Sequence, residues 1–317
     1  MTGPDRTRPA APDRPLVGLV TVTYSPGEAL AGMLDSLPGA YGGAIQVVLA
    51  DNGSTDGSVE EAAERPGVRL VRTGGNLGYG RAANVGVRAL DPTIDWVVIT
   101  NPDIVLAPGA IDALPDCAGR HPTSGAFGPL ITTPDGVIYP SARNLPSIAD
   151  GVGHAAFGWW WPTNPWTRRY RLDAQDPVER VAGWLSGSCL LVRRRAFEQV
   201  GGFDESYFMY FEDVDLGDRL ARAGWSNIYC PSARAAHEGG HATERQPVAM
   251  ARAHHRSAYR YLATRHPAWW QAPLRWALKA GLGARALLAG RLHKVAAGAE
   301  LPERHADGPT PGSRRTS

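Results

Sequence analysis

Residues 97–105 read VVITNPDIV, an apolar run that breaks at an amide, a proline and a carboxylate and then turns apolar again. The β-branched residues before the break predict a buried strand at Trp96–Thr100, and the Asn-Pro pair marks a turn after it. Asp103 therefore stands just beyond the end of a strand. It could bind a divalent cation. It could instead cap a helix expected over Pro108–Gly119 or form an Asx-turn after Asn101-Pro102, and these residues alone favour neither interpretation.

The same pattern of strand, polar turn and helix extends toward the N-terminus. Strands are expected at Leu16–Thr23, Ile45–Ala50 and Val68–Arg72, and helices at Gly27–Leu37, Ser58–Glu64 and Tyr79–Leu90. This alternation predicts an α/β fold with a parallel, doubly wound sheet. Ligands of such sheets bind beyond the carboxyl ends of the strands, so residues 24–27, 51–57 and 101–103 are candidate site segments. In segment 51–57, Asp51 could accept a hydrogen bond from a pyrimidine, or the segment could be an Asx-rich turn that caps a helix.

The second half of the chain offers further elements and two candidate chemical groups. We expect strands at Trp184–Arg194 and Asn227–His237, and helices at Glu212–Gly224, Met250–His266 and Pro273–Lys294. Glu212 and Asp213 could be present simply because the helix dipole stabilises acidic residues in the first turn. Alternatively, the aromatic run 207–211 could raise the pKa of one carboxylate toward the value that a general base needs. His237, at a strand end, could complete the shell of a cation or be structural, and the glycines before His241 indicate a loop.

Composition and missing motifs exclude several functions. The chain has 317 residues, 43% of them hydrophobic, and a net charge of +2, so it can bury a core and nothing indicates nucleic acid as a partner. Three widely spaced cysteines, without a CxxC pair, argue against a disulfide framework or a metal cluster and suit a reducing cytoplasm. No GxGxxG or P-loop string follows the first strand. No apolar run is long enough to span a membrane, and residues 1–14 and 299–317 are expected to be disordered.

Seven motifs occur in one order along the chain. They are TVTYSPG, LADNGSTDGS, NLGYGRAANVG, VVITNPDIV, WLSGSCLLVRR, FDESYFMYFEDVDLGDRLARAGW and AAHEGG. This set resembles the family 2 glycosyltransferases of the GT-A fold. The resemblance implies a Rossmann-like, mixed and mostly parallel sheet flanked by helices, with C-terminal helices. It places a glycosyltransferase domain at 15–245, with a nucleotide-binding half at 15–105 and an acceptor-binding half at 106–245, followed by a helical segment at 246–298.

A narrower resemblance rests on the strings PDGVIYPSARNLPS, WPTNPW and GWLSGSCLLVRR. These are similar to bacterial rhamnosyltransferases that move L-rhamnose from dTDP-L-rhamnose to polyprenyl-diphospho-N-acetylglucosamine in the synthesis of the arabinogalactan linkage unit. The resemblance implies an inverting enzyme that works in the cytoplasm, peripherally on the inner face of the cell membrane. The alternatives are a glycosyltransferase with another nucleotide sugar and a polysaccharide acceptor, or a nucleotide-sugar-binding protein without turnover. The oligomeric state is left open.

The family resemblance also implies roles for single residues. The nucleotide sugar would be bound by Thr23, Tyr24, Asp51, Asn76, Gly78, Arg81, Asn84 and Asn101. Trp184, Ser186 and Gly187 would contact the acceptor, and Asp213, next to Glu212, would be the catalytic base. Asp103 and His237 would bind Mn²⁺ or Mg²⁺. Asn101 replaces the first acid of the family's DxD motif, which leaves the cation more dependent on Asp103 and His237.

A membrane surface is the remaining expected partner, because the implied acceptor is a lipid. Residues 266–294 combine three tryptophans with five lysines and arginines, as an interfacial basic amphipathic helix does. The alternative is a C-terminal helix that packs on the domain and exposes a basic face. Trp159–Trp161 could add to the same surface or pack within a loop.

Overall fold

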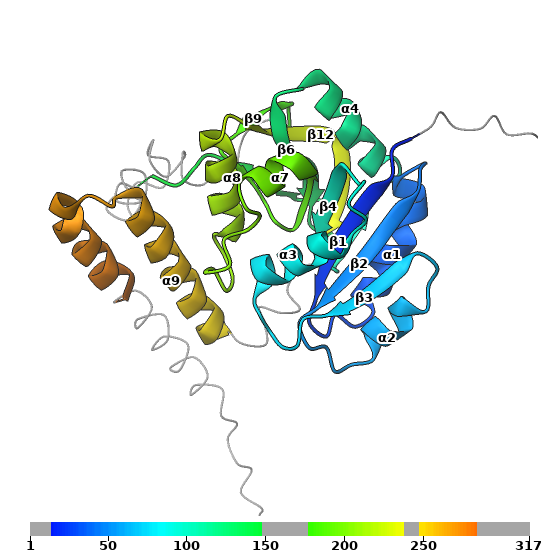
Figure 1. Cartoon of the computed structure of the whole chain (residues 1–317), viewed down its shortest axis with the longest axis horizontal. Coiled ribbons are helices and arrows are strands. Elements are labelled where there is room, and N and C mark those ends of the chain that lie inside the picture. Colours follow the sequence, from blue (N-terminus) through cyan, green and yellow to red (C-terminus); the bar gives the residue numbers. More distant parts are fainter. Residues whose placement is uncertain (1–13, 148–176, 238–246, 284–317) are drawn as a thin grey trace, which may run out of the picture.

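A computed structural model describes residues 14–147, 177–237 and 247–283 of the chain (Figure 1). The first half alternates strands and helices as the sequence predicts. Its elements are β1 (Val17–Thr23), α1 (Ala29–Ala40), β2 (Ile45–Asp51), α2 (Ser58–Ala63), β3 (Val68–Arg72), α3 (Tyr79–Ala89) and β4 (Trp96–Thr100). Each begins and ends within a few residues of its predicted bounds. The predictions that residues 1–14 and 299–317 are disordered lie outside the described residues, except for Arg14.

The second half adds shorter strands and the C-terminal helices. In chain order they are β5 (Ile104–Leu106), α4 (Ala110–Arg120), β6 (Ser124–Thr132), β7 (Ile138–Tyr139), β8 (Ala142–Arg143), β9 (Arg180–Ala182), β10 (Trp184–Leu185), β11 (Cys189–Arg193), α7 (Arg194–Gln199), α8 (Glu212–Arg222), β12 (Ser226–His237), α9 (Pro247–Arg265) and the 3₁₀ turn η1 (Trp269–Gln271). A further helix spans 272–283. The tryptophan-rich segment 158–166 and His241 lie outside the described residues.

One mixed sheet runs through both halves of the domain. Its strand order is β3-β2-β1-β4-β11-β6-β12-β5. Strands β3, β2, β1 and β4 are parallel, and β11 inserts antiparallel between β4 and β6. The predicted mixed, mostly parallel sheet is therefore confirmed, and the carboxyl ends of β1, β2 and β4 meet at one edge.

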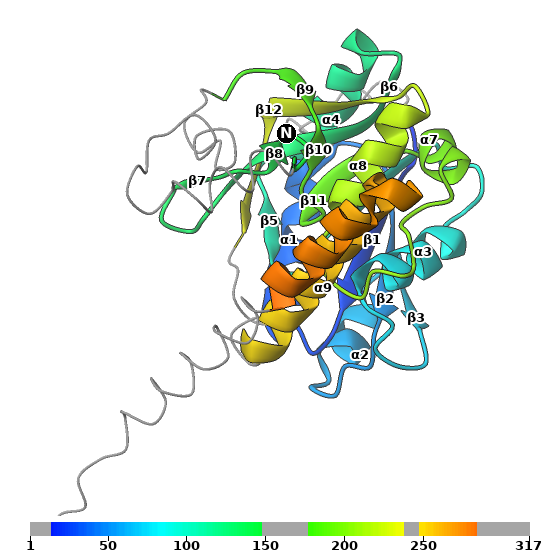
Figure 2. The same cartoon turned by 90° about the vertical axis from the view of Figure 1, so that its left-hand side faces the viewer.

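Alternating side chains of the sheet pack against helices on both faces. Leu19 of β1 belongs to a core with α1 and α4, whereas its neighbour Val20 belongs to a core with α3, α7 and α8. This division follows from the two-residue period of a strand. The helices visible on the two sides of the sheet in Figures 1 and 2 thus exclude water from both faces.

Two parts of the sheet differ from the sequence prediction. The single strand predicted at Trp184–Arg194 is two strands, β10 and β11, separated by a turn at 186–188. Strand β6 was not predicted, because glycines interrupt its apolar pattern. The structure explains these glycines: a Cβ at Gly125 would lie 3.0 Å from Trp225, and one at Gly128 would lie 2.8 Å from Leu185. The strand needs small residues where neighbouring elements pack closely.

The cysteines also differ from expectation. Cys117 of α4 and Cys230 of β12 form a disulfide across a sequence separation of 113 residues, and Cys189 is a buried free thiol. The argument from cysteine spacing against a disulfide framework did not foresee this single bond, and the cysteines therefore no longer support a reducing compartment. Spacing could not reveal the bond because it depends on α4 packing against β12.

The C-terminal helices lie against the second half of the domain. Tyr261 of α9 is buried with Tyr207 and Val214, so α9 covers the segment that leads into α8. Helix 272–283 then runs back beside α9 (Figure 2). Among the described helices, none combines the length and apolarity required to span a membrane.

Candidate active site

The turn after β4 brings a carboxylate, an imidazole and an amide together. His237, at the end of β12, pairs in register with Ile104 of β5, which sets its ring beside Asp103. Its Nε2 lies 3.1 Å from Oδ1 of Asp103 and 3.4 Å from the side-chain nitrogen of Asn101. Helix α4 begins seven residues later behind Gly109. Asp103 therefore does not cap that helix. Its contact with His237, a possible second ligand, supports the interpretation that it binds a cation.

A second carboxylate lies next to the turn between β10 and β11. Oδ2 of Asp213 accepts a hydrogen bond from the Gly187 N–H at 3.0 Å, and the Tyr79 hydroxyl donates to the Gly187 carbonyl at 2.5 Å. The same turn contacts the end of β4, because the Asn101 N–H donates to the Ser188 carbonyl at 2.8 Å. Turn 186–188 therefore connects the candidate base to the segment that carries Asp103.

Burial sets the protonation of the acidic pair at the start of α8. Burial raises the pKa of Asp213, and the Gly187 N–H partly offsets this by favouring the charged form. Burial and the neighbouring charge of Asp213 raise the pKa of Glu212, whose Oε2 has no hydrogen-bond partner in the described structure. Burial of the two neighbouring carboxyls therefore favours their protonated forms more than in free carboxyls.

The aromatic segment before this pair has an unusual backbone. Tyr210 and Phe211 have φ values of 66° and 68°, in the left-handed region that side chains rarely adopt. Upstream, the Tyr79 N–H donates to the Phe208 carbonyl at 3.0 Å, and a Cβ on Gly78 would overlap that carbonyl. Gly78 therefore permits the aromatic segment to lie directly on the start of α3. The glycine was predicted as a site residue, but this contact was not.

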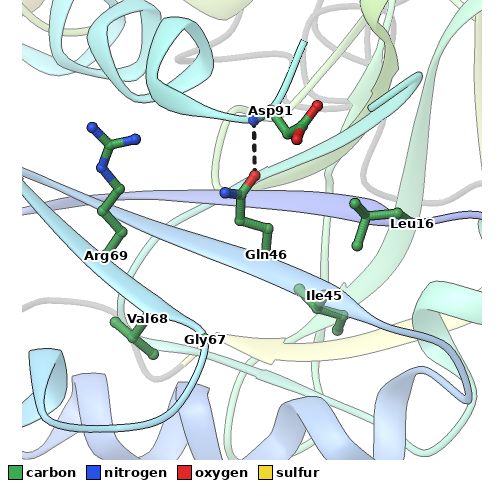
Figure 3. A pocket seen from close by; sticks show the side chains of 7 residues that line it. All are labelled: Leu16, Ile45, Gln46, Gly67, Val68, Arg69 and Asp91. Carbon is green, nitrogen blue, oxygen red and sulfur yellow. Dashed lines mark hydrogen bonds between the residues drawn. The ribbon is translucent and has the colours of Figure 1, made fainter. Parts of the chain in front are cut away.

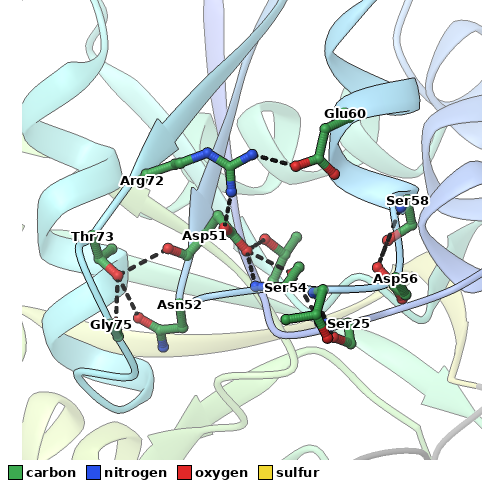
Figure 4. Close-up of polar contacts among 12 residues, drawn as sticks. Ser25, Asp51, Asn52, Ser54, Asp56, Ser58, Glu60, Arg72, Thr73 and Gly75 are labelled. Atoms are coloured by element: carbon green, nitrogen blue, oxygen red, sulfur yellow. Dashed lines mark hydrogen bonds and ion pairs between the residues drawn. The ribbon is translucent and has the colours of Figure 1, made fainter.

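Polar groups at the ends of β1 and β2 converge on Asp51 (Figure 4). Its Oδ1 accepts hydrogen bonds from the Thr23 hydroxyl at 3.1 Å and from the N–H and hydroxyl of Ser54, and its Oδ2 is 3.0 Å from Arg72. Asp51 is 1% exposed, whereas the adjacent Tyr24 is 55% exposed. The sequence missed Ser54 and Arg72, which fix the carboxylate. The same segment forms the predicted Asx turn, in which Asp56 accepts the Ser58 N–H. The prediction that Asp56 or Ser58 caps the next helix is wrong, because Gly57 is the N-cap of α2 and no side-chain hydrogen bond caps this described helix.

The other predicted nucleotide-sugar residues lie on or before α3. Asn76 is exposed and accepts the Gly78 N–H at 3.1 Å. Arg81 is paired with Glu205, 3.3 Å away. Asn84 is 4% exposed, and its amide both donates to and accepts from the backbone of Phe203 at 2.9 Å. Arg81 and Asn84 thus tie α3 to the segment that precedes α8.

The predicted acceptor residues surround the same turn. The Trp184 Nε1–H donates to the Asn144 carbonyl at 3.0 Å, and the Ser186 hydroxyl is 2.8 Å from that of Ser188. Gly187 contacts Asp213 directly. Of the three predicted acceptor residues, Gly187 alone is shown in contact with the candidate base, and Trp184 and Ser186 precede it in β10 and the turn.

Two other features lie away from this cluster. A surface pocket of about 400 Å³ lies at the amino-terminal ends of β1–β3, opposite the candidate site (Figure 3). Its lining residues are Leu16, Ile45, Gln46, Gly67, Val68, Arg69 and Asp91. Cys117, Glu179 and Cys230 have the spacing of metal ligands, but the disulfide occupies both thiols. We therefore assign neither feature to the active site.

The fold and this site define a nucleotide-sugar-dependent transferase of the GT-A type. Residues 19–201 match the model of glycosyl transferase family 2, and residues 167–292 match that of glycosyl transferase family group 2. The chain therefore belongs to glycosyltransferase family 2, as its motifs predict. It is 54% identical over 280 residues to the N-acetylglucosaminyl-diphospho-decaprenol L-rhamnosyltransferase of Mycobacterium tuberculosis, an alignment that covers 85% of this chain and 91% of the relative.

More distant proteins share the family or the fold. The rhamnosyltransferase WbbL of Escherichia coli is 29% identical over 200 residues, which are 60% of this chain and 72% of WbbL. The mannosyltransferase PcManGT of Pyrobaculum calidifontis, solved with GDP-Man and Mn²⁺, superposes with a TM-score of 0.53 at 20% identity. That alignment covers 92% of this chain and 83% of PcManGT, and it supports the fold alone.

Proposed function

We propose that this glycosyltransferase moves L-rhamnose from dTDP-L-rhamnose to a polyprenyl-diphospho-N-acetylglucosamine acceptor, in the synthesis of the arabinogalactan linkage unit. The observation that carries the proposal is the 54% identity with the mycobacterial L-rhamnosyltransferase, which extends over 91% of that enzyme. The arrangement of Asp213, Gly187 and Tyr79 supports it, because it provides a buried base beside the predicted acceptor residues.

Asp213 acts as the general base in this proposal. Its carboxylate takes the proton of the acceptor hydroxyl, C3-OH of N-acetylglucosamine, as that oxygen attacks C1 of the rhamnosyl donor. The bond from C1 to the nucleotide's phosphate oxygen breaks on the opposite face, so the anomeric configuration inverts. The Gly187 N–H orients the carboxylate. Glu212 has its pKa raised by burial and keeps a proton that limits the charge beside the base.

Asp103 and His237, with Asn101 beside them, would hold a divalent cation. The His237 Nε2 lies 3.1 Å from Asp103 Oδ1 and 3.4 Å from the Asn101 amide nitrogen, at the edge of the sheet where the donor phosphates would bind. An imidazole among oxygen donors suits Mn²⁺ better than Mg²⁺. A bound cation would neutralise charge on the leaving nucleotide diphosphate.

Tyr24 and Asp51 would receive the nucleotide base. The exposed ring of Tyr24 offers a stacking surface, and the fixed carboxylate of Asp51 offers an acceptor for the N3–H of thymine. Thr23, Asn76 and Gly78 remain proposed contacts of the same ligand. Arg81 and Asn84 would act indirectly, because they fix the segment around Phe203 and Glu205 next to α3.

A membrane surface would present the acceptor. Trp269, Trp270 and Trp276 are 85%, 65% and 69% exposed, and they stand on the C-terminal helices near Arg275 and Lys279. Exposed tryptophans among basic residues are typical of helices that lie in a lipid interface. The enzyme would thus work peripherally on the cytoplasmic face of the membrane.

A ligand-binding panel tests the donor. A ligand that binds only the native state raises the melting temperature as its concentration rises. We expect dTDP with Mn²⁺ to raise the melting temperature more than UDP, GDP or CDP. Mn²⁺ without a nucleotide is the control. A larger shift with UDP than with dTDP would contradict the rhamnose assignment, and transfer assays with dTDP-L-rhamnose would then fail as well.

A further inference from the structure

Arg143 stands next to the candidate acceptor site, and within the described part of the chain it has no anionic partner. Strand β8 pairs antiparallel with β10, and Arg143 is directly opposite Trp184. The guanidinium carbon lies 5.7 Å from the centre of the Trp184 ring, over its face. This cation–π contact fixes the side chain, because a guanidinium stacks well on an indole.

The position of β10 connects this arginine with the reacting groups. Trp184 packs against Gly217 of α8, where a Cβ would lie 2.8 Å from the tryptophan. Two residues after the strand, Gly187 donates its N–H to Asp213. Arg143 therefore lies on the acceptor side of the candidate base, close enough for its charge to lower the pKa of Asp213.

No described residue bonds to the terminal nitrogens of Arg143. Its Nε donates to the Pro140 carbonyl at 2.8 Å. Among residues 14–147, 177–237 and 247–283, no carboxylate pairs with the guanidinium, although most other arginines of the domain have such a partner. A fixed cation next to a base that needs a high pKa disfavours proton abstraction. An anion bound to Arg143 would remove this disadvantage.

We propose that Arg143, stacked on Trp184, binds the diphosphate of the lipid-linked acceptor through its terminal nitrogens. The inference rests on the proposed function, which supplies the acceptor's chemistry. Arginine suits this ligand because its planar fork donates two parallel hydrogen bonds to phosphate oxygens. In the proposed function Asp103 and His237, at the ends of β4 and β12, would bind the donor diphosphate. Arg143 would then bind the other diphosphate, that of the acceptor. When the acceptor binds, its diphosphate neutralises the guanidinium at the same time as its sugar hydroxyl reaches Asp213.

Two acceptors separate a diphosphate contact from a structural role. One is N-acetylglucosaminyl diphosphate esterified to a short alkyl chain, and the other is the matching alkyl N-acetylglucosaminide without phosphate. In Arg143→Gln we expect kcat/KM for the diphosphate acceptor to fall about 10- to 100-fold, the usual loss for a hydrogen bond to a charged group. The variant should lose no kcat/KM with the neutral acceptor, because removing the guanidinium only relieves the Asp213 base of a nearby positive charge. The KM for the donor should be unaffected. Arg143→Lys should recover part of the loss, since it restores the charge but not the fork.

Arg69→Gln is the matched control. Arg69 is exposed and, like Arg143, donates to a backbone carbonyl, that of Ala89, but it lies at the opposite edge of the sheet. An equal loss with both acceptors, or a raised KM for the donor, would overturn the assignment.

Calorimetric binding of the two acceptors tests the site even if rhamnose is the wrong sugar. Wild-type protein should bind the diphosphate compound more tightly than the neutral one, and Arg143→Gln should abolish this preference. A preference that survives in the variant would also refute the site. Failure of the wild-type enzyme to transfer rhamnose would instead refute the proposed function.

Discussion

Asp213 is the residue on which the proposed chemistry depends most directly. Replacement by asparagine keeps the shape and can still accept the Gly187 N–H. It removes the proton acceptor, so we expect kcat to fall about 10²- to 10⁴-fold, the range that general-base catalysis supplies. Initial rates with saturating donor and acceptor measure this loss.

Donor binding provides the control for this variant. The shift of melting temperature by dTDP and Mn²⁺ should match that of the wild type, because Asp213 does not lie among the nucleotide-binding residues. Asp35→Asn, at a carboxylate that is 70% exposed and paired with Arg65, controls for loss of a charge. Near-native turnover of Asp213→Asn would remove Asp213 from the role of base.

Glu212 makes folding stability depend on pH. Burial raises its pKa in the folded protein to about 8, against about 4.5 unfolded. The folded state thus binds the proton more tightly, so the free energy of unfolding should decrease as pH rises from about 5 to about 8. In Glu212→Gln this part of the decrease should disappear. Urea denaturation at both ends of the range measures it, and an unchanged pH dependence would show that Glu212 is ionised in the folded protein.

At the scale of elements, α9 holds the segment that leads into the acidic pair. The Ser257 hydroxyl, on a residue that is 6% exposed, donates to the Met209 carbonyl at 2.9 Å. The ring of His254 contacts both Tyr210 and Phe211, with centroid separations of 5.4 Å. The two left-handed residues are therefore held from outside the loop, as strained backbone requires.

Ser257→Ala should lower kcat without changing donor binding. Loss of the hydrogen bond to Met209 costs about 1 kcal/mol and loosens the backbone that aims Glu212 and Asp213. Thr264→Ala is the matched control, since its hydroxyl also donates to a carbonyl of α9, that of Tyr261, but farther along the helix. Steady-state measurements of kcat and of the donor KM in both variants test this prediction. Equal effects on kcat would mean that only the stability of α9 was changed.

At the scale of the whole molecule, the C-terminal helices join the candidate membrane surface to the catalytic segment. Replacing Trp269, Trp270 and Trp276 by serine removes most of the exposed aromatic area there. We expect weaker flotation with anionic vesicles and slower transfer to an acceptor embedded in lipid. Transfer to a short-chain, water-soluble acceptor should be unaffected, because these residues do not contact the site.

A control for this triple variant is Val178→Ser, at another apolar side chain that is 57% exposed. It should leave flotation unchanged. Unaltered flotation of the tryptophan variant would indicate that the helices expose a basic face without entering the lipid interface, which is the alternative that the sequence left open.

The sequence by itself determined the elements of the nucleotide-binding half and the segments that flank the site. The periodic spacing of apolar residues predicted β1 to β4 and the helices between them. This spacing can be read locally, because it involves residues within one helical turn or one strand. The ordered motifs then determined the family and singled out Asp103, Asp213 and His237. Their residue types limited the chemistry to cation binding and proton transfer.

Only the tertiary structure decided how these groups face one another. Asp103 meets His237 across 134 residues, and Asp213 meets Gly187 across 26, through strand pairings that leave no local trace. The disulfide, the fixation of Asp51 by Arg72 and the contact of Arg143 with Trp184 have the same origin. Sequence patterns report which face of an element is buried. Which element covers it depends on packing among segments far apart in the chain, and that packing positions the catalytic groups.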